Sequence, residues 1–121
     1  MDQFPLVYRC AVLVKPKKPF LDWLNKIELS VRTSLDELHR DCHVYLVPDY
    51  EEVEVIEIAI EKYLKLHYSD IFINELSAWY TDERKFPKIT YALFLKWFEI
   101  SMNTMIFDTV DLPLEKEDDY L

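Results

Sequence analysis

The chain of 121 residues contains no glycine, and this absence restricts the loops that it can build. Glycine supplies the positive φ angles and the close backbone approach that phosphate-binding loops, dinucleotide-binding turns and catalytic serine elbows require. The glycine-rich motifs of these proteins are therefore missing, and the sequence argues against nucleotide-dependent chemistry. A two-residue hairpin would also lack the residue that it prefers.

Length and composition indicate one domain over residues 1–121. Half of the residues are hydrophobic and 15% are aromatic, which excludes a disordered chain, and this length suffices for one core. No apolar run is long enough to cross a membrane, and residues 1–5 carry no leader pattern, so we expect a cytoplasmic protein without a membrane partner. Two cysteines do not make a disulfide framework, and we expect Cys10 and Cys42 to be reduced and buried.

The net charge of −9, from 23 acidic and 14 basic residues, limits the kinds of partner. Such a surface repels nucleic acid on average, and the small group of Lys15, Lys17 and Lys18 is the best local exception. An acidic surface keeps a protein soluble and can also steer it toward a basic protein. We therefore expect a protein partner, with no nucleic acid and no cofactor.

Alternating apolar residues predict a first strand over residues 6–14. Pro16 ends this strand because it cannot donate to a ladder. Pro19 opens a helix, in whose first turn its missing N–H costs nothing. The apolar spacing along this helix predicts that Trp23 is a core anchor. The core face of the strand is expected to carry Leu6, Tyr8, Cys10, Val12 and Val14.

A capping box marks a second, short helix, in which the Ser34 hydroxyl and the Glu37 carboxylate each satisfy a free backbone N–H group. Residues 43–47 follow as a second strand. Residues 51–67 contain many β-branched residues, but glutamates at helical spacing and the length of the segment favour a helix. Ser69 is expected to cap a further helix.

Thr90 is expected to cap another short helix, after which the hydrophobic period changes to that of a strand. The alternation at residues 98–103 and the apolar segment 105–110 predict the two strands of a terminal hairpin, with its turn at residues 101–104. Residues 115–121 are acidic, and we expect a frayed tail there.

These elements predict an α+β single domain with a mixed four-stranded sheet, in the order β-α-α-β-α-α-α-β-β, and with helices packed on it. The first two strands are joined through helices, so we expect them to be parallel with a right-handed crossover. The last two strands should be antiparallel.

The segment from His39 to His43 is the one compact group of candidate metal ligands in the sequence. His39, Cys42 and His43 carry the imidazole and thiolate groups that zinc prefers, but a structural zinc site needs four ligands. The alternative is that His39 stabilises a helix C-terminus and Cys42 is a small buried residue. A cysteine nucleophile would in addition need an imidazole within hydrogen-bond reach.

Large aromatic side chains stand beside charged ones in the second half of the chain, a combination that is typical of interface hot spots. An acidic group at the start of the helix predicted at 51–67 is a second candidate surface. The alternative is that the aromatic residues end an apolar helix stripe and fill the core. The predicted binding residues are Trp79, Tyr80, Arg84, Trp97, Glu51, Glu52 and Glu54.

Residues 9–24 (RCAVLVKPKKPFLDWL) and residues 79–111 resemble a small bacterial family of conserved hypothetical proteins. The resemblance implies a bacterial, cytoplasmic protein and transfers no catalytic residue. We expect a non-catalytic protein-binding module, one form of which is an immunity-like or antitoxin-like inhibitor that covers the basic active site of a nuclease. The alternative is an enzyme or metal-dependent protein that uses His39, Cys42 and His43.

Overall fold

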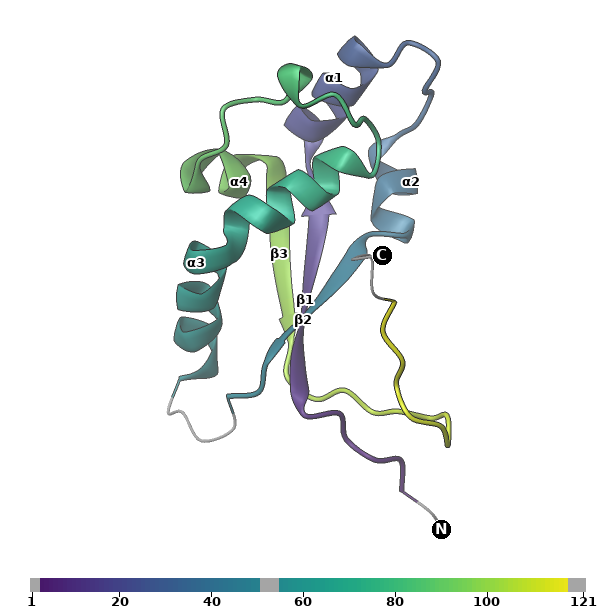
Figure 1. Ribbon diagram of the computed structural model, residues 1–121, viewed down its shortest axis with the longest axis vertical. Coiled ribbons are helices and arrows are strands. Elements are labelled where there is room, and N and C mark those ends of the chain that lie inside the picture. Colours follow the sequence, from purple (N-terminus) through teal and green to yellow (C-terminus); the bar gives the residue numbers. More distant parts are fainter. Residues whose placement is uncertain (1–2, 51–54, 118–121) are drawn as a thin grey trace.

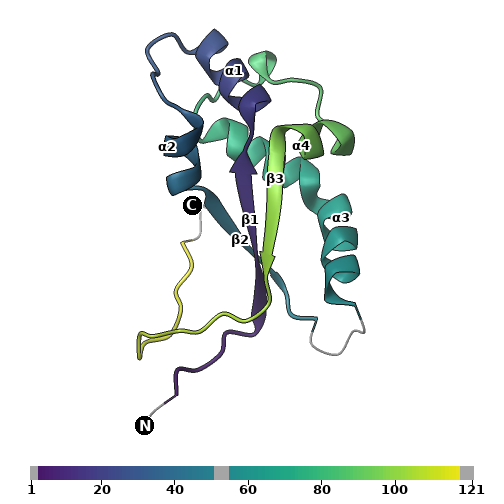
Figure 2. The same cartoon turned by 180° about the vertical axis from the view of Figure 1, so that it is seen from behind.

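A computed structural model describes residues 3–50 and 55–117 as a three-stranded sheet with helices packed on one of its faces (Figures 1 and 2). None of the described helices is both long and apolar enough to cross a membrane. The elements in chain order are β1 (Arg9–Pro16), α1 (Lys18–Ile27), α2 (Leu35–Arg40), β2 (His43–Pro48), α3 (Ile56–Ser77), the 3₁₀ helix η1 (Glu83–Lys85), α4 (Tyr91–Trp97) and β3 (Phe98–Asn103).

The sheet has the order β2-β1-β3, and β1 pairs antiparallel with both neighbours. The α+β class is confirmed, whereas the predicted parallel pairing of the first two strands is wrong. Val14 pairs with His43, so the connection between β1 and β2 leaves and returns at the same end of the sheet. A parallel crossover would need a helix that runs back along the strands. The ten residues of α1 span about 15 Å and the six of α2 about 9 Å, whereas the eight residues of β1 span about 26 Å.

The predicted fourth strand and terminal hairpin are also wrong. Helix α4 leads directly into β3, because Phe98 is both the C-cap of the helix and the first residue of the strand. The chain then continues past Asn103, and residues 105–110 form a single isolated bridge, between Leu6 and Phe107. No described residue has a positive φ, so residues 3–50 and 55–117 contain none of the tight hairpin turns that require one.

Helix α3 is one continuous helix, although two were predicted between residues 51 and 80. Ser69 lies inside it, where neither proline nor glycine interrupts the backbone hydrogen bonds. The predicted start at residues 51–54 lies outside the described part of the chain. The helical spacing of its residues thus determines the structure of this segment. Neither its β-branched residues nor the ability of Ser69 to cap a helix interrupts α3.

The predicted caps at Ser34 and Thr90 are confirmed. The Ser34 hydroxyl accepts from the Glu37 backbone N–H at 3.3 Å, and the Thr90 hydroxyl accepts from that of Leu93 at 3.1 Å. The reciprocal half of the capping box is absent, because the Glu37 carboxylate accepts from the Thr33 hydroxyl at 3.0 Å. A contact between the Thr33 and Glu37 side chains therefore replaces the expected hydrogen bond from the Ser34 backbone N–H to the Glu37 carboxylate.

The core lies between the sheet and the helices, and the predicted core face of β1 is confirmed only for Cys10, Val12 and Val14, which are buried. Leu6 and Tyr8 are exposed because they precede β1 and extend beyond the sheet. Phenylalanines of α1, α3, α4 and β3 fill the centre, with ring centroids 5.3–5.9 Å apart in the closest pairs: Phe20, Phe72, Phe94 and Phe98.

Two residues predicted for the core are only partly buried. Trp23 packs against this aromatic core while its indole N–H reaches the Lys85 carbonyl oxygen at 2.9 Å. Cys10 and Cys42 are both free thiols, but only Cys10 is buried. Cys42 is half-buried and lies in the short link between α2 and β2.

Candidate functional site

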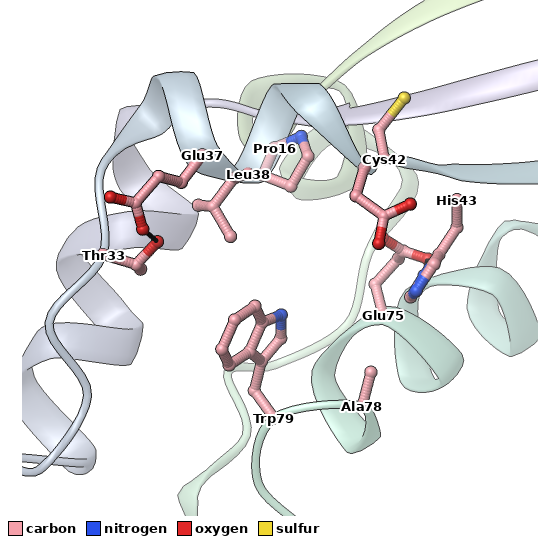
Figure 3. A pocket seen from close by; sticks show the side chains of 10 residues that line it. Pro16, Thr33, Glu37, Leu38, Cys42, His43, Glu75, Ala78 and Trp79 are labelled. Atoms are coloured by element: carbon pink, nitrogen blue, oxygen red, sulfur yellow. Dashed lines mark hydrogen bonds and ion pairs between the residues drawn. The ribbon is translucent and has the colours of Figure 1, made fainter.

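A cavity of about 350 Å³ opens at the end of the sheet where β1 finishes and β2 begins (Figure 3). Helix α2 and the two residues after it form one wall, and the C-terminal turn of α3 forms the other. The residues that line it are Pro16, Thr33, Glu37, Leu38, Asp41, Cys42, His43, Glu75, Ala78 and Trp79.

Glu75 is the central polar side chain of this site and is 4% exposed. It lies on the inward face of α3, beside the buried Leu76. Its Oε2 accepts a hydrogen bond from the Tyr45 hydroxyl and is 2.6 Å from Nδ1 of His43. Two donors thus compensate the carboxylate for the loss of water, which a buried polar group requires.

The contacts around Oε2 link three side chains into one hydrogen-bonded chain. An ionised carboxylate only accepts, so an ionised Glu75 pairs with the tautomer of His43 that carries a proton on Nδ1. Asn74 donates to the Tyr45 oxygen at 2.9 Å and completes the chain. Burial raises the pKa of Tyr45 above its ordinary value, and the hydrogen bond and negative charge of Glu75 raise it further, so this hydroxyl acts as a donor.

The lining of the cavity is acidic. Glu37, Asp41 and Glu75 contribute three carboxyl groups, and His43 is the only side chain with basic character among the described lining residues. Figure 3 shows Trp79 with its ring on the side of the cavity opposite α2, and this side chain is 40% exposed. Carboxyl groups and an indole ring that line the same cavity form an environment that attracts cations.

The structure distributes the three candidate metal ligands among different contacts. Nε2 of His39 is 2.6 Å from the Pro16 carbonyl oxygen, whereas His43 contacts Glu75. The sulfur of Cys42 points away from the cavity and from the His43 ring (Figure 3). Within residues 3–50 and 55–117, no three histidine, cysteine or acidic side chains are grouped in a way that could hold a metal ion.

The predicted binding residues occupy separate places. Trp79 lines the cavity, and Tyr80 follows it as a half-buried residue. Arg84 is exposed and pairs with Asp82 at 3.0 Å, which lowers the pKa of that carboxyl group. Trp97 packs against the core, with its ring 5.6 Å from that of Phe72. Residues 51–54, which include the three predicted glutamates, lie outside the described residues.

Glu75, Tyr45 and Asp41 were not identified from the sequence as site residues. One signal was present for Glu75, because it stands between Phe72 and Leu76 on a stripe that packs inward. A charged residue at a buried helix position needs a partner or a function. Tyr45 and Asp41 gave no such signal, since their roles depend on the antiparallel placement of β2.

Comparison with protein-family models, with curated proteins and with solved structures finds no match for this chain. The resemblance of residues 9–24 and 79–111 to a bacterial family therefore stays an expectation.

Proposed function

We propose that the chain is a non-catalytic binding module that docks onto a basic protein by taking one lysine or arginine side chain into the cavity. The observation that carries this proposal is the buried Glu75 carboxylate, fixed by Tyr45 and His43 at the wall of a cavity that Trp79 closes on one side. A fixed acceptor needs no reorganisation when a cation arrives, and a charge-assisted hydrogen bond is about twice as strong as a neutral one.

The dimensions of the cavity support a side chain as its ligand. Its volume of about 350 Å³ is near the lower end of the range for small-molecule sites, roughly 300–1,000 Å³. Asp41 is exposed at the cavity wall, and Glu75 lies buried beside His43. An extended cation can thus meet one carboxylate on entry and a second one further in, while its aliphatic stem lies against Trp79.

The charge of the whole chain supports the same kind of partner. A net charge of −9 attracts a basic surface and speeds its encounter with this one. An inhibitor that covers the basic active site of a nuclease is a specific form of this proposal, in which an active-site lysine or arginine would enter the cavity.

A titration with N-acetyl-arginine amide, followed by heteronuclear NMR, tests the cavity. We expect shifts at Glu75, Trp79 and the start of β2, and none with the neutral isostere N-acetyl-citrulline amide. Asp41→Asn should weaken binding about fivefold, which is close to 1 kcal/mol.

Glu61→Gln is the matched control, because it removes the same charge from an exposed position on α3. Equal loss in Asp41→Asn and Glu61→Gln would indicate general charge attraction without a site. Equal binding of the arginine and citrulline compounds would contradict the proposal.

A further inference from the structure

One face of the sheet is left uncovered by the described residues. All the helices pack on the face that carries Cys10, Val12 and Val14 (Figures 1 and 2). Strand alternation places the next residues on the opposite face, where Leu13 pairs with Val44, and Ala11 with Leu46. The two β2 side chains are 55% and 50% exposed, whereas Ala11 is buried and Leu13 is half-buried. Their β3 partners, Asn103 and Ser101, are polar, so the exposed apolar surface of this face lies along β2.

The chain also carries an apolar C-terminal arm, which we define as residues 104–117. Residues 105–108 continue beyond the sheet beside the N-terminal segment, held by hydrogen bonds from Val7 N–H to the Ile106 oxygen at 2.7 Å and from Asp108 N–H to the Pro5 oxygen at 2.9 Å. Figures 1 and 2 show the arm leaving the end of β3, turning, and running back alongside the molecule toward the end of the sheet where β2 begins. Five large apolar side chains of the arm are more than half exposed: Met105, Phe107, Val110, Leu112 and Leu114.

The charges of the uncovered face and of the arm are of opposite sign. Arg9 and Lys15 lie on the uncovered face near the two ends of β1. The acidic residue of this face on the paired strands is Glu99, the register partner of Lys15. The arm contains four acidic residues and one lysine. An acidic and apolar segment therefore complements a face that carries two cations, one carboxylate and the exposed apolar side chains of β2, in a molecule whose net charge otherwise opposes self-association.

We propose that two copies of this chain form a dimer by exchanging their C-terminal arms, each arm lying across the uncovered sheet face of the other copy. A second copy is the occupant that fits, because the chain carries both halves of the complementary pair. The bonds to Val7 and Pro5 hold residues 105–108 beside the N-terminal segment, and the apolar side chains that follow, Val110, Leu112 and Leu114, stay more than half exposed in the single chain. A two-fold axis makes both contacts at once, as in an isologous interface.

Light scattering coupled to size-exclusion chromatography of the full chain tests this proposal. We expect a mass twice the 14.6 kDa of one chain. The face variant Leu46→Asp and the arm variant Leu112→Asp/Leu114→Asp should each weaken dimerisation by about tenfold or more. Leu66→Asp is the matched control, because Leu66 is 79% exposed on α3, away from both surfaces, and this variant should remain dimeric.

Mixing the two variants distinguishes exchange from other modes of association. The arm variant keeps an intact face and the face variant keeps an intact arm, so one of the two contacts can form in a mixed dimer. At a concentration at which each variant alone is monomeric, we expect the mixture to dimerise. Circular dichroism checks that both are folded, and Val44→Asp is the second face variant. A monomeric wild-type chain, dimers that persist in both variants, or a mixture that stays monomeric would each overturn the proposal.

Discussion

Glu75 is a charged side chain at a core position, and its contribution to stability depends on its two donors. Replacing it by alanine leaves the partly buried Tyr45 hydroxyl and the His43 imidazole without this acceptor. We expect Glu75→Ala to lower the free energy of unfolding by about 1–3 kcal/mol. Urea denaturation measures this change.

Glu61→Ala provides the comparison for Glu75, because it removes a carboxylate from an exposed position of the same helix. Its effect should stay within about 0.5 kcal/mol. A Glu75→Ala protein as stable as the wild type would mean that the cost of burying the carboxylate cancels the gain from its hydrogen bonds.

Tyr45 links the site to the pH dependence of stability. Burial raises the pKa of its hydroxyl in the folded chain above the ordinary value, which is about 10 in an unfolded chain. The unfolded state therefore loses this proton first, and the free energy of unfolding should fall as pH rises above about 10.

Burial raises the pKa of Tyr50 and Tyr91 as well, so Tyr45→Phe should reduce the alkaline loss of stability without abolishing it. Urea unfolding at a series of alkaline pH values measures the slope, and an unchanged slope in Tyr45→Phe would contradict the assignment.

At the scale of the elements, Ser34 and Ser69 differ only in position. Ser34 caps α2, so Ser34→Ala should cost about 1 kcal/mol, while Ser34→Asp should cost little. Ser69 lies inside α3, where alanine is the better helix former, so Ser69→Ala should be neutral or stabilising by a few tenths of a kcal/mol. Thermal denaturation of both variants checks the opposite signs. A loss at Ser69 similar to that at Ser34 would indicate a helix boundary at residue 69.

The elements that the sequence predicted well are those whose signals are local. The apolar alternation of β1, the proline that begins α1 and the hydroxyl caps of α2 and α4 depend on neighbours within a few residues. The relative direction of the strands could not be predicted from such local signals. Antiparallel pairing of β1 with β2 depends on where a 26-residue connection, residues 17–42, returns to the sheet, and no local pattern encodes that direction.

The candidate site was predicted only in part for the same reason. Trp79 was identified because aromatic residues beside charges are recognisable along the chain. The acidic residues that line the cavity with it are Glu37 of α2, Asp41 directly after α2, and Glu75 of α3. The fold brings these two segments together, so their proximity to Trp79 exists only in the folded chain. Trp97 shows the reverse case, since its position beside charges suggested a surface and its ring contacts place it against the core.

At the scale of the whole molecule, the net charge and the cavity should affect different steps of binding. A net charge of −9 acts at long range and guides encounter, while the carboxylates of the cavity act only after contact. We predict that Glu51, Glu52 and Glu54 act at long range on encounter, and that Asp41 acts in the cavity after contact. The two effects can therefore be separated by kinetics.

Surface plasmon resonance with an immobilised synthetic arginine-rich peptide makes this separation. We expect the association rate to fall as salt is raised, because screening shortens the reach of the charges to about 10 Å at 0.1 M and about 3 Å at 1 M. Changing Glu51, Glu52 and Glu54 together to glutamine lowers the net charge from −9 to −6 and should slow association with little effect on dissociation. Asp41→Asn should instead speed dissociation. An association rate indifferent to salt, or an Asp41→Asn effect confined to association, would contradict this division between long-range charge and cavity contacts.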